Sequence, residues 1–274
     1  MTLKVITGGS VSAAVADFVP QLVADKVASR IAAKDFTLWG KDAEAESSIR
    51  MGWVTSASDS QGLVADIISL REEFAAKGVT RFVLCGMGGS SLAPEVITRT
   101  AGVELVVLDS TNADQVGATL AGDLAATAIV VSSKSGSTVE TDSQKRIFEQ
   151  AFVDAGIDKT DRIVIVTDPG SPMQKAAEAD GYRIFNADPT VGGRYSALTA
   201  FGLVPSGLAG ADIQALLDSA NSVADLLASD DASNPALVLG AALGATPGEY
   251  GLRDKIGIVN DGTSIVGFGD WAEQ

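Results

Sequence analysis

The chain has 274 residues, 46% of them hydrophobic, and its 35 acidic and 20 basic residues give a formal net charge of −15. A surface this acidic repels nucleic acid and anionic membranes, so we expect neither as a partner. Histidine is absent and Cys85 is the single cysteine. This excludes Ser-His-Asp and Cys-His catalysis, histidine-ligated metal sites and an internal disulfide. We expect no metal ion and no cofactor.

The N-terminal sequence does not indicate export or membrane insertion. Residues 1–10, MTLKVITGGS, lack the basic and apolar runs of a signal peptide. No apolar stretch of the chain reaches the ~18–20 residues of a membrane span. Together with the single cysteine, this favours a cytoplasmic location.

Helices are predicted before the first apolar β-rich run. Residues 10–34 read as one helix, or as two helices broken at Pro20, and residues 60–78 read as another that ends at Gly78. We assign residues 1–50 to an N-terminal helical segment.

Five short apolar runs follow, with amphipathic segments between them. The runs are RFVLCGM (81–87), ELVVLDS (104–110), TAIVVSS (127–133), RIVIVTD (162–168) and YRIFNAD (182–188). Buried strands that alternate with helices predict a parallel sheet covered on both faces. We therefore predict an α/β fold, a doubly wound parallel sheet flanked by helices, over residues 51–210.

The remaining residues predict helices and one more strand. Residues 211–246 contain two helical segments separated by SDDASNP, and we take residues 211–254 as a helical connection. The run KIGIVNDG (255–262) predicts a strand followed by a turn. Because a lone strand needs a sheet to join, we interpret residues 255–274 as the start of a second, truncated α/β domain.

Two loops at the predicted carboxyl ends of strands stand out, since ligands of open parallel sheets bind there. In CGMGGSSLAPEV, three glycines allow close backbone approach, although a serine-capped turn is an equally good explanation. A nicotinamide site is a weak rival there, because the G-x-G-x-x-G pattern is incomplete. In SSKSGSTVE, Ser137 and Glu140 fit a helix capping box. The remaining hydroxyls of Ser133, Ser135 and Thr138 predict a phosphate site at a helix N-terminus.

Three charged or reactive residues also have an ordinary structural explanation. Lys134 adds positive charge to the serine-rich loop, but a solvated surface lysine is the commoner outcome. Arg194 follows two glycines in DPTVGGRYSALTAFG, which raises its chance of contacting a ligand. Cys85 ends a buried strand, and we expect it to belong to the core.

At these loops the sequence resembles phosphoglucose isomerase (glucose-6-phosphate isomerase), a family built from two sugar-isomerase (SIS) domains. The matching pieces are GMGGSSLAP, SSKSGSTVET and GGRYSALTAFGL, in the family's order. The similarity extends from about residue 35 to the last residue. It implies an SIS-type fold, a sugar monophosphate substrate, a role in glycolysis and gluconeogenesis, and a homodimer in the full-length family context.

The resemblance also implies roles for individual residues. Gly89 and Ser90 contact the sugar, and Arg194 stabilises the enediolate that forms as a proton moves between C1 and C2. Four residues hold the phosphate: Ser133, Lys134 through its backbone, Ser135 and Thr138. Gly136 stands where many relatives have a bulkier residue, so we expect the stiffness of this loop to differ.

The family's other catalytic groups are missing from this sequence. Neither the glutamate base of an E-S-x-G-K motif, nor the ring-opening histidine, nor the late lysine occurs in residues 1–274. We interpret the chain as the N-terminal portion of a glucose-6-phosphate isomerase, which carries the phosphate-binding half of the site and is inactive alone. The alternative is a non-catalytic phosphosugar-binding module with a sensing or regulatory role.

Overall fold

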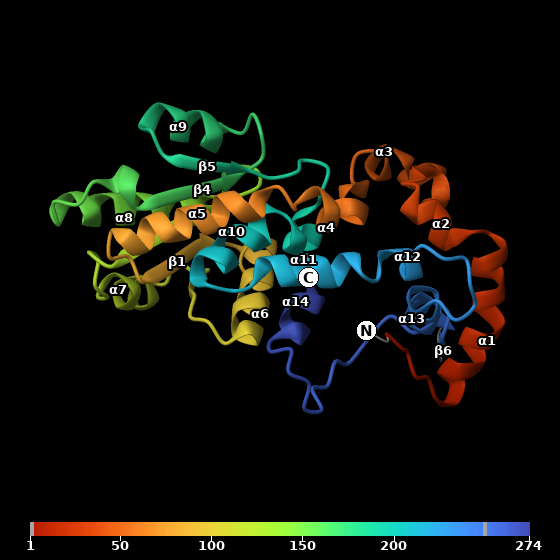
Figure 1. Cartoon of the computed structure of the whole chain (residues 1–274). Helices are drawn as coiled ribbons and strands as arrows, with labels where there is room; N and C mark the ends of the chain where they lie inside the picture. Colours follow the sequence, from red (N-terminus) through yellow and green to blue (C-terminus); the bar gives the residue numbers. More distant parts are fainter. Residues whose placement is uncertain (1–2, 249–250) are drawn as a thin grey trace. The chain divides into compact units, whose positions relative to one another are not determined.

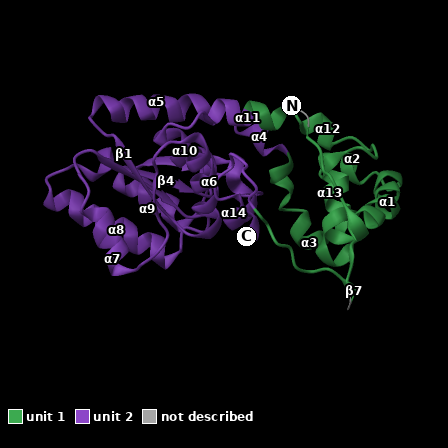
Figure 2. Cartoon of the chain, turned by 90° about the horizontal axis from the view of Figure 1, so that it is seen from below, with its two compact units in different colours: residues 1–54, 218–259 green, residues 55–217, 260–274 purple. Residues whose placement is uncertain are grey.

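The computed structural model describes residues 3–248 and 251–274 and divides into two compact units (Figures 1 and 2). One unit comprises residues 55–217 and 260–274, and the other comprises residues 1–54 and 218–259. The predicted domain division at residues 50, 210 and 254 is not tested by these units and stays a prediction.

The larger unit is built on a five-stranded parallel sheet with the strand order β2-β1-β3-β4-β5. Figure 1 labels β1, β4 and β5 of this sheet. Val83 of β1 pairs with Val106 of β2 on one side and with Ile129 of β3 on the other. The strands are β1 Arg81–Gly86, β2 Val106–Leu108, β3 Thr127–Ser132, β4 Ile163–Thr167 and β5 Arg183–Asn186. Each lies within the predicted apolar run, so the predicted α/β fold is confirmed.

Helices cover both faces of this sheet. Successive residues of a strand point to opposite faces, so Leu84 of β1 joins one apolar cluster while Val83 and Cys85 join the other. The first cluster packs against α5 and α10, and the second packs against α7, α8 and α9. The helices that lie wholly in this unit are α4 Ser56–Asp59, α5 Leu63–Ala76, α6 Leu92–Ala101, α7 Ala113–Leu120, α8 Val139–Asp154, α9 Pro172–Asp180, α10 Ala200–Ala209 and α14 Phe268–Glu273. Helix α11, Ile213–Asn221, begins in this unit and ends in the smaller one.

The smaller unit is mainly helical, and its helices α1 and α13 pack together. Its elements are α1 Gly9–Ala24, α2 Val27–Ala32, α3 Glu44–Ser47, α12 Ala224–Leu227, α13 Pro235–Gly244 and the two-residue strands β6 Pro247–Gly248 and β7 Gly251–Leu252. Helix α1 continues through Pro20, and the break falls at Lys26, whose φ of 54° is left-handed. A proline removes one helical hydrogen bond, whereas a left-handed residue turns the chain. Of the two alternatives for residues 10–34, two helices are therefore correct, but the proposed break at Pro20 is wrong.

The strand predicted over residues 255–262 is also wrong. These residues have no regular secondary structure, and their side chains are exposed. A strand needs a neighbour to pair its backbone N–H and C=O groups, and no strand of the described residues pairs with this segment. The apolar pattern alone therefore does not make a strand here.

Among the described residues, no helix combines the length and apolar character required to cross a membrane.

Candidate functional site

The candidate site lies at the carboxyl ends of the central strands. Strands β1 and β3 are neighbours, although β2 lies between them in sequence, so the connections leave them in opposite directions along the sheet. Such a switch point leaves a crevice between the following loops, where open α/β sheets bind their ligands. The glycine-rich loop follows β1 and the serine-rich loop follows β3, so both predicted binding loops begin at this point.

The glycine-rich loop contacts the segment that carries the predicted catalytic arginine. Its residues Gly88–Ser90 form a short 3-10 helix, and a Cβ on Gly89 would lie 2.4 Å from the carbonyl oxygen of Gly193. It would also lie 3.0 Å from the backbone nitrogen of Arg194. Only glycine permits so close a backbone approach. Two of the three predicted loops are thus brought together.

The serine-rich loop folds around its own hydroxyl groups. The hydroxyl oxygens of Ser133 and Thr138 lie 3.1 Å apart, and Ser133 Oγ also accepts from the backbone N–H of Gly136 at 3.2 Å. Ser135 Oγ accepts from the backbone N–H of Ser137 at 3.2 Å and from its hydroxyl at 3.0 Å. Ser133 is buried, whereas Ser135 and Ser137 are exposed at the surface of the loop.

The predicted capping box at Ser137 and Glu140 is not formed. Helix α8 begins at Val139, its N-cap residue is Thr138, and no side chain caps it. Ser137 precedes the N-cap residue by one position, and its hydroxyl donates to Ser135 Oγ instead of capping the first turn of α8. The first N–H groups of α8 therefore have no side-chain acceptor at the N-cap, and a helix N-terminus in this condition favours anions.

The loop after β4 supports the serine-rich loop from one side. Gly136 has a left-handed φ of 67°, and a Cβ there would lie 2.8 Å from Cβ of Met173. Thr167 donates to the carbonyl oxygen of Ser133 at 2.7 Å, and its hydroxyl lies 2.8 Å from that of Ser171. A bulkier residue at position 136 would not fit this packing, so the glycine is a steric requirement of this particular chain.

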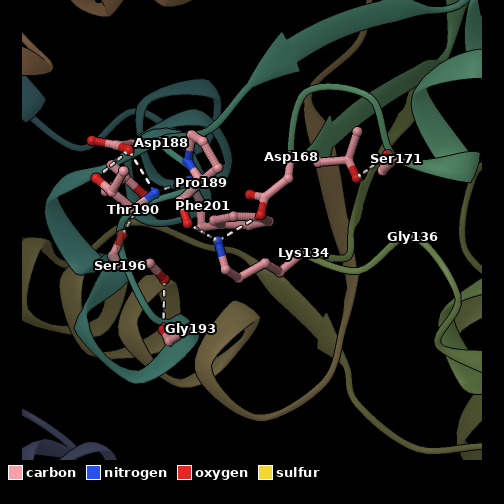
Figure 3. A network of polar contacts seen from close by, with 12 residues as sticks. Lys134, Gly136, Asp168, Ser171, Asp188, Pro189, Thr190, Gly193, Ser196 and Phe201 are labelled. Carbon is pink, nitrogen blue, oxygen red and sulfur yellow. Dashed lines mark hydrogen bonds and ion pairs between the residues drawn. The ribbon is translucent and has the colours of Figure 1, made fainter. Parts of the chain in front are cut away.

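Lys134 is neither a free surface charge nor a side chain that lies over the hydroxyl groups. Its Nζ lies 2.6 Å from Oδ2 of Asp168 and 3.4 Å from the carbonyl oxygen of Pro189 (Figure 3). Sequence reasoning missed Asp168, although it directly follows the run RIVIVT at the same edge of the sheet. An acidic residue at the end of a predicted parallel strand was the available signal.

Arg194 lies in a second 3-10 helix, Gly193–Leu198, between β5 and α10. The hydroxyl of Ser196 donates to the carbonyl oxygen of Gly193 at 2.7 Å and closes this turn (Figure 3). Arg194 is exposed, and within residues 3–248 and 251–274 its guanidinium makes no ion pair. It is therefore available for an anionic ligand beside the glycine-rich loop.

Two serines of the glycine-rich loop, Ser90 and Ser91, are buried. The hydroxyl of Ser91 donates to the carbonyl oxygen of Gly88 at 3.0 Å. Sequence reasoning also missed Gln274, whose side-chain amide would lie 3.5 Å from a Cβ on Gly88. Its position in sequence carries no signal, because it is the folding of α14 against α6 that places it there.

Cys85 belongs to the core, as predicted. It is fully buried, and burial raises the pKa of its thiol from 9.0 to about 12. A thiol with this pKa is not a nucleophile near neutral pH. Among the residues that the structure describes, no cluster of three or more acidic, cysteine or histidine side chains is placed to hold a metal ion.

A cavity of about 360 Å³ lies at the opposite end of the sheet. It is lined by Leu70, Glu73, Phe74, Thr160, Asp161, Ile163, Gly181, Tyr182, Arg183 and Ile184. None of the predicted site residues borders it. Its charged groups, Glu73, Asp161 and Arg183, are already joined in ion pairs with one another or with Lys77.

A family model matches the chain over most of the α/β region. The Phosphoglucose isomerase model covers residues 61–246 of the 274, a span that includes all three loops. The chain belongs to the phosphoglucose isomerase family. The resemblance seen in the three loop motifs is thereby confirmed.

Curated proteins and solved structures agree with this family membership. A "Probable glucose-6-phosphate isomerase" of Haloarcula marismortui is 35% identical over 200 residues, which cover 70% of this chain and 44% of that protein. A "Glucose-6-phosphate isomerase" of Thermus thermophilus is 35% identical over 178 residues, 63% of this chain and 42% of that protein. The chain therefore spans less than half the length of these relatives.

Two crystal structures share the fold. A hypothetical protein from Thermus thermophilus has a TM-score of 0.71 and 30% sequence identity, covering 85% of this chain and 55% of its own. A glucose-6-phosphate isomerase from Chlamydia trachomatis has a TM-score of 0.58 at 24% identity, covering 69% of this chain and 41% of its own. The second likeness supports the fold alone.

Proposed function

We propose that this chain forms the phosphate-binding half of an aldose-ketose isomerase site for glucose 6-phosphate and fructose 6-phosphate. The observation that carries the proposal is the cluster of hydroxyl groups at the uncapped N-terminus of α8. The glycine-rich loop, which leaves the adjacent strand β1, contacts the backbone of Arg194. One end of a phosphosugar and its reacting carbons would therefore have separate, neighbouring binding loops.

The serine-rich loop suits a phosphate in a protein of net charge −15. Ser135 and Thr138 would donate hydroxyl hydrogen bonds, and the backbone of Lys134 would add an N–H donor. Ser133 would bind the phosphate with its hydroxyl once the contact to Thr138 opens, or would otherwise hold Thr138 in place. Neutral donors and the helix dipole bind a dianion without a large patch of positive side chains.

The reacting end of the sugar would lie at the glycine-rich loop. Gly89 and Ser90 would contact the sugar, and the close packing of Gly89 against the backbone of Gly193 would hold this loop beside Arg194. Arg194 would face the oxygen atoms of C1 and C2 as the proton moves between these carbons. Its planar guanidinium would donate hydrogen bonds to the enediolate and stabilise the negative charge that develops there.

The proton transfer itself needs groups that the sequence does not supply. A base must lie within about 2.6–3.2 Å of the proton that it removes, and ring opening needs a proton donor and acceptor. The chain has no histidine, and Glu273 is exposed at the end of α14. We therefore propose that residues 1–274 bind phosphosugar but do not isomerise it by themselves.

A non-catalytic module that senses or regulates through phosphosugar binding is the second candidate function. The absence of histidine favours it for this chain, whereas the exposed Arg194 beside the glycine-rich loop favours the isomerase. A module needs only the phosphate loop, so its affinity would not depend on Arg194. Comparing Arg194→Ala with wild type for the binding of fructose 6-phosphate and of inorganic phosphate separates the two. Weaker binding of the sugar phosphate alone supports the isomerase site.

The central test removes two of the hydroxyl donors. In Ser135→Ala/Thr138→Ala, each lost hydrogen bond to a charged phosphate should weaken binding by roughly 1.5–3 kcal/mol. Isothermal titration calorimetry with fructose 6-phosphate measures this change. Ser143→Ala is the control, because its hydroxyl donates to the carbonyl oxygen of Val139 within α8. Equal affinity in the double variant and wild type would exclude this loop as the phosphate site.

A further inference from the structure

Lys134 is the positively charged residue of the serine-rich loop 133–138, but other partners hold its ammonium group. The Nζ atom lies 2.6 Å from Oδ2 of Asp168 and 3.4 Å from the carbonyl oxygen of Pro189. Figure 3 shows the side chain extended toward these two residues, with Gly136 of the same loop on the other side of its backbone. The charge that would naturally meet a phosphate is therefore neutralised.

The ion pair is only partly accessible to solvent. The side chains of Lys134 and Asp168 are 23% and 18% exposed, so water screens their attraction less than at an open surface. The second oxygen of Asp168, Oδ1, is buried and has no hydrogen-bond partner among the described residues. A carboxylate with one unsatisfied oxygen depends on its remaining partner, which ties the ammonium firmly to Asp168.

Asp168 is itself held by the sheet. It directly follows Thr167, the last residue of β4, whose hydroxyl donates to the carbonyl oxygen of Ser133 at 2.7 Å. The carboxylate and the serine-rich loop are thus fixed to the same strand end. Lys134 cannot turn toward a ligand in the loop without breaking its contact with a group in a fixed position.

We propose that Asp168 withholds the Lys134 ammonium from the bound phosphate, so that the loop binds the monoester with neutral donors alone. The proposal rests on the proposed function, because it concerns the same phosphate site. A free ammonium beside a phosphate dianion would add a Coulomb attraction that strengthens binding and slows release. Asp168 is thus a residue that tunes affinity and that does not itself contact the ligand.

The test is the isosteric variant Asp168→Asn, which removes the negative charge and frees the ammonium. We expect inorganic phosphate and fructose 6-phosphate to bind about three- to tenfold more tightly at low ionic strength, as a new charge contact near a partly buried site would give. The gain should shrink as KCl is added, because salt screens the new attraction. Unchanged or weaker binding by folded Asp168→Asn overturns the proposal.

Asp188→Asn is the matched control for net charge. Asp188 lies on the neighbouring loop, where its carboxylate accepts hydrogen bonds from the backbone N–H and hydroxyl of Thr190 (Figure 3). This variant removes one negative charge without releasing Lys134, so we expect less than a twofold change. Equal tightening in both aspartate variants would mean that overall charge sets the affinity, and the proposal would be wrong.

Lys134→Met, which keeps the Asp168 carboxylate, tests the same idea by a second route. Lys134→Met leaves the Asp168 carboxylate unpaired near the phosphate, so binding should weaken. Lys134→Met/Asp168→Asn removes that repulsion and should bind more tightly than Lys134→Met, but no more tightly than wild type. A double variant that keeps the tightening of Asp168→Asn would show that the ammonium is not its source.

The outcomes separate this inference from the proposed function. If wild type binds neither fructose 6-phosphate nor inorganic phosphate in calorimetry, the phosphate site itself is wrong. If wild type binds and Ser135→Ala/Thr138→Ala weakens the binding, the site is supported whatever Asp168→Asn does. The sign of the change in Asp168→Asn then decides the role of Asp168.

Discussion

Gly89 and Gly193, more than one hundred residues apart in sequence, meet backbone to backbone at the candidate site. A Cβ on Gly89 would lie 2.4 Å from the carbonyl oxygen and 2.6 Å from the carbonyl carbon of Gly193. Real Cβ atoms do not approach backbone this closely, so the contact requires glycine at position 89. It places the loop after β1 against the segment that carries Arg194.

We predict that Gly89→Ala destabilises the protein and displaces Arg194. The added methyl group must push the backbone of residues 193–194 away, and overpacking of this kind costs typically 1–3 kcal/mol. Thermal denaturation and calorimetry with fructose 6-phosphate should show lower stability and weaker binding. The control is Gly193→Ala, where a Cβ would meet nothing within 4 Å and the change in stability should stay within about 0.5 kcal/mol. Equal effects of the two variants would contradict the contact.

Gly136→Ala should lower the free energy of unfolding more than Gly156→Ala, which introduces the same backbone strain without a steric clash. Both Gly136 and Gly156 have a left-handed φ, of 67° and 70°. At Gly156 a Cβ meets nothing within 4 Å, so Gly156→Ala should cost only the strain of about 1–2 kcal/mol. At Gly136 the Cβ also meets Met173 at 2.8 Å, which adds about 1–3 kcal/mol. Urea denaturation of both variants measures the difference, and equal losses would argue against the packing at Met173.

The thiol of Cys85 should be unreactive in the folded protein. Its raised pKa should also make the free energy of unfolding decrease at high pH. Burial raises the pKa of its thiol to about 12, above the ordinary value of 9.0. The unfolded chain therefore loses this proton first, and the free energy of unfolding falls as pH rises above about 9, by up to ~1.4 kcal/mol per pH unit. Native protein at pH 8 should not react with a thiol reagent until it unfolds. In Cys85→Ala this part of the pH dependence should disappear; reaction of the native thiol would contradict its burial.

Residues 1–274 should show negligible conversion of fructose 6-phosphate to glucose 6-phosphate. Loss of a positioned base typically lowers the rate by ~10²–10⁴-fold, and the absence of histidine slows ring opening as well. A coupled assay measures the conversion, with a complete glucose-6-phosphate isomerase as the positive control. Strong turnover that Glu273→Gln abolishes would place the base within this chain and contradict the prediction.

NADH and NADPH should not bind measurably. The loop after β1 lacks the complete G-x-G-x-x-G pattern, and the contact between Gly89 and Gly193 occupies the side on which a dinucleotide would need open backbone. Thermal shift assays should give a higher melting temperature with fructose 6-phosphate and no change with NADH. A shift of several degrees with NADH alone would favour a dehydrogenase.

The local sequence determined the sheet and the positions of the two candidate binding loops. Strands that are buried on both faces read as short, nearly continuous apolar runs, and each predicted run contains the corresponding observed strand. Loops that begin at the carboxyl ends of parallel strands meet at one edge of the sheet, so the glycine-rich and serine-rich motifs pointed to one site. The core position of Cys85 followed from the same pattern.

Only the tertiary structure decided which groups in those loops are partners. Lys134 pairs with Asp168 because β3 and β4 are neighbours in the sheet, and Gly89 meets Gly193 because the chain returns to β1 after β5. The residues 255–262 look like a strand but have no neighbour to pair with among the described residues. Local periodicity reports which face of an element is apolar, whereas hydrogen-bond and ion-pair partners depend on the order in which distant segments are brought together.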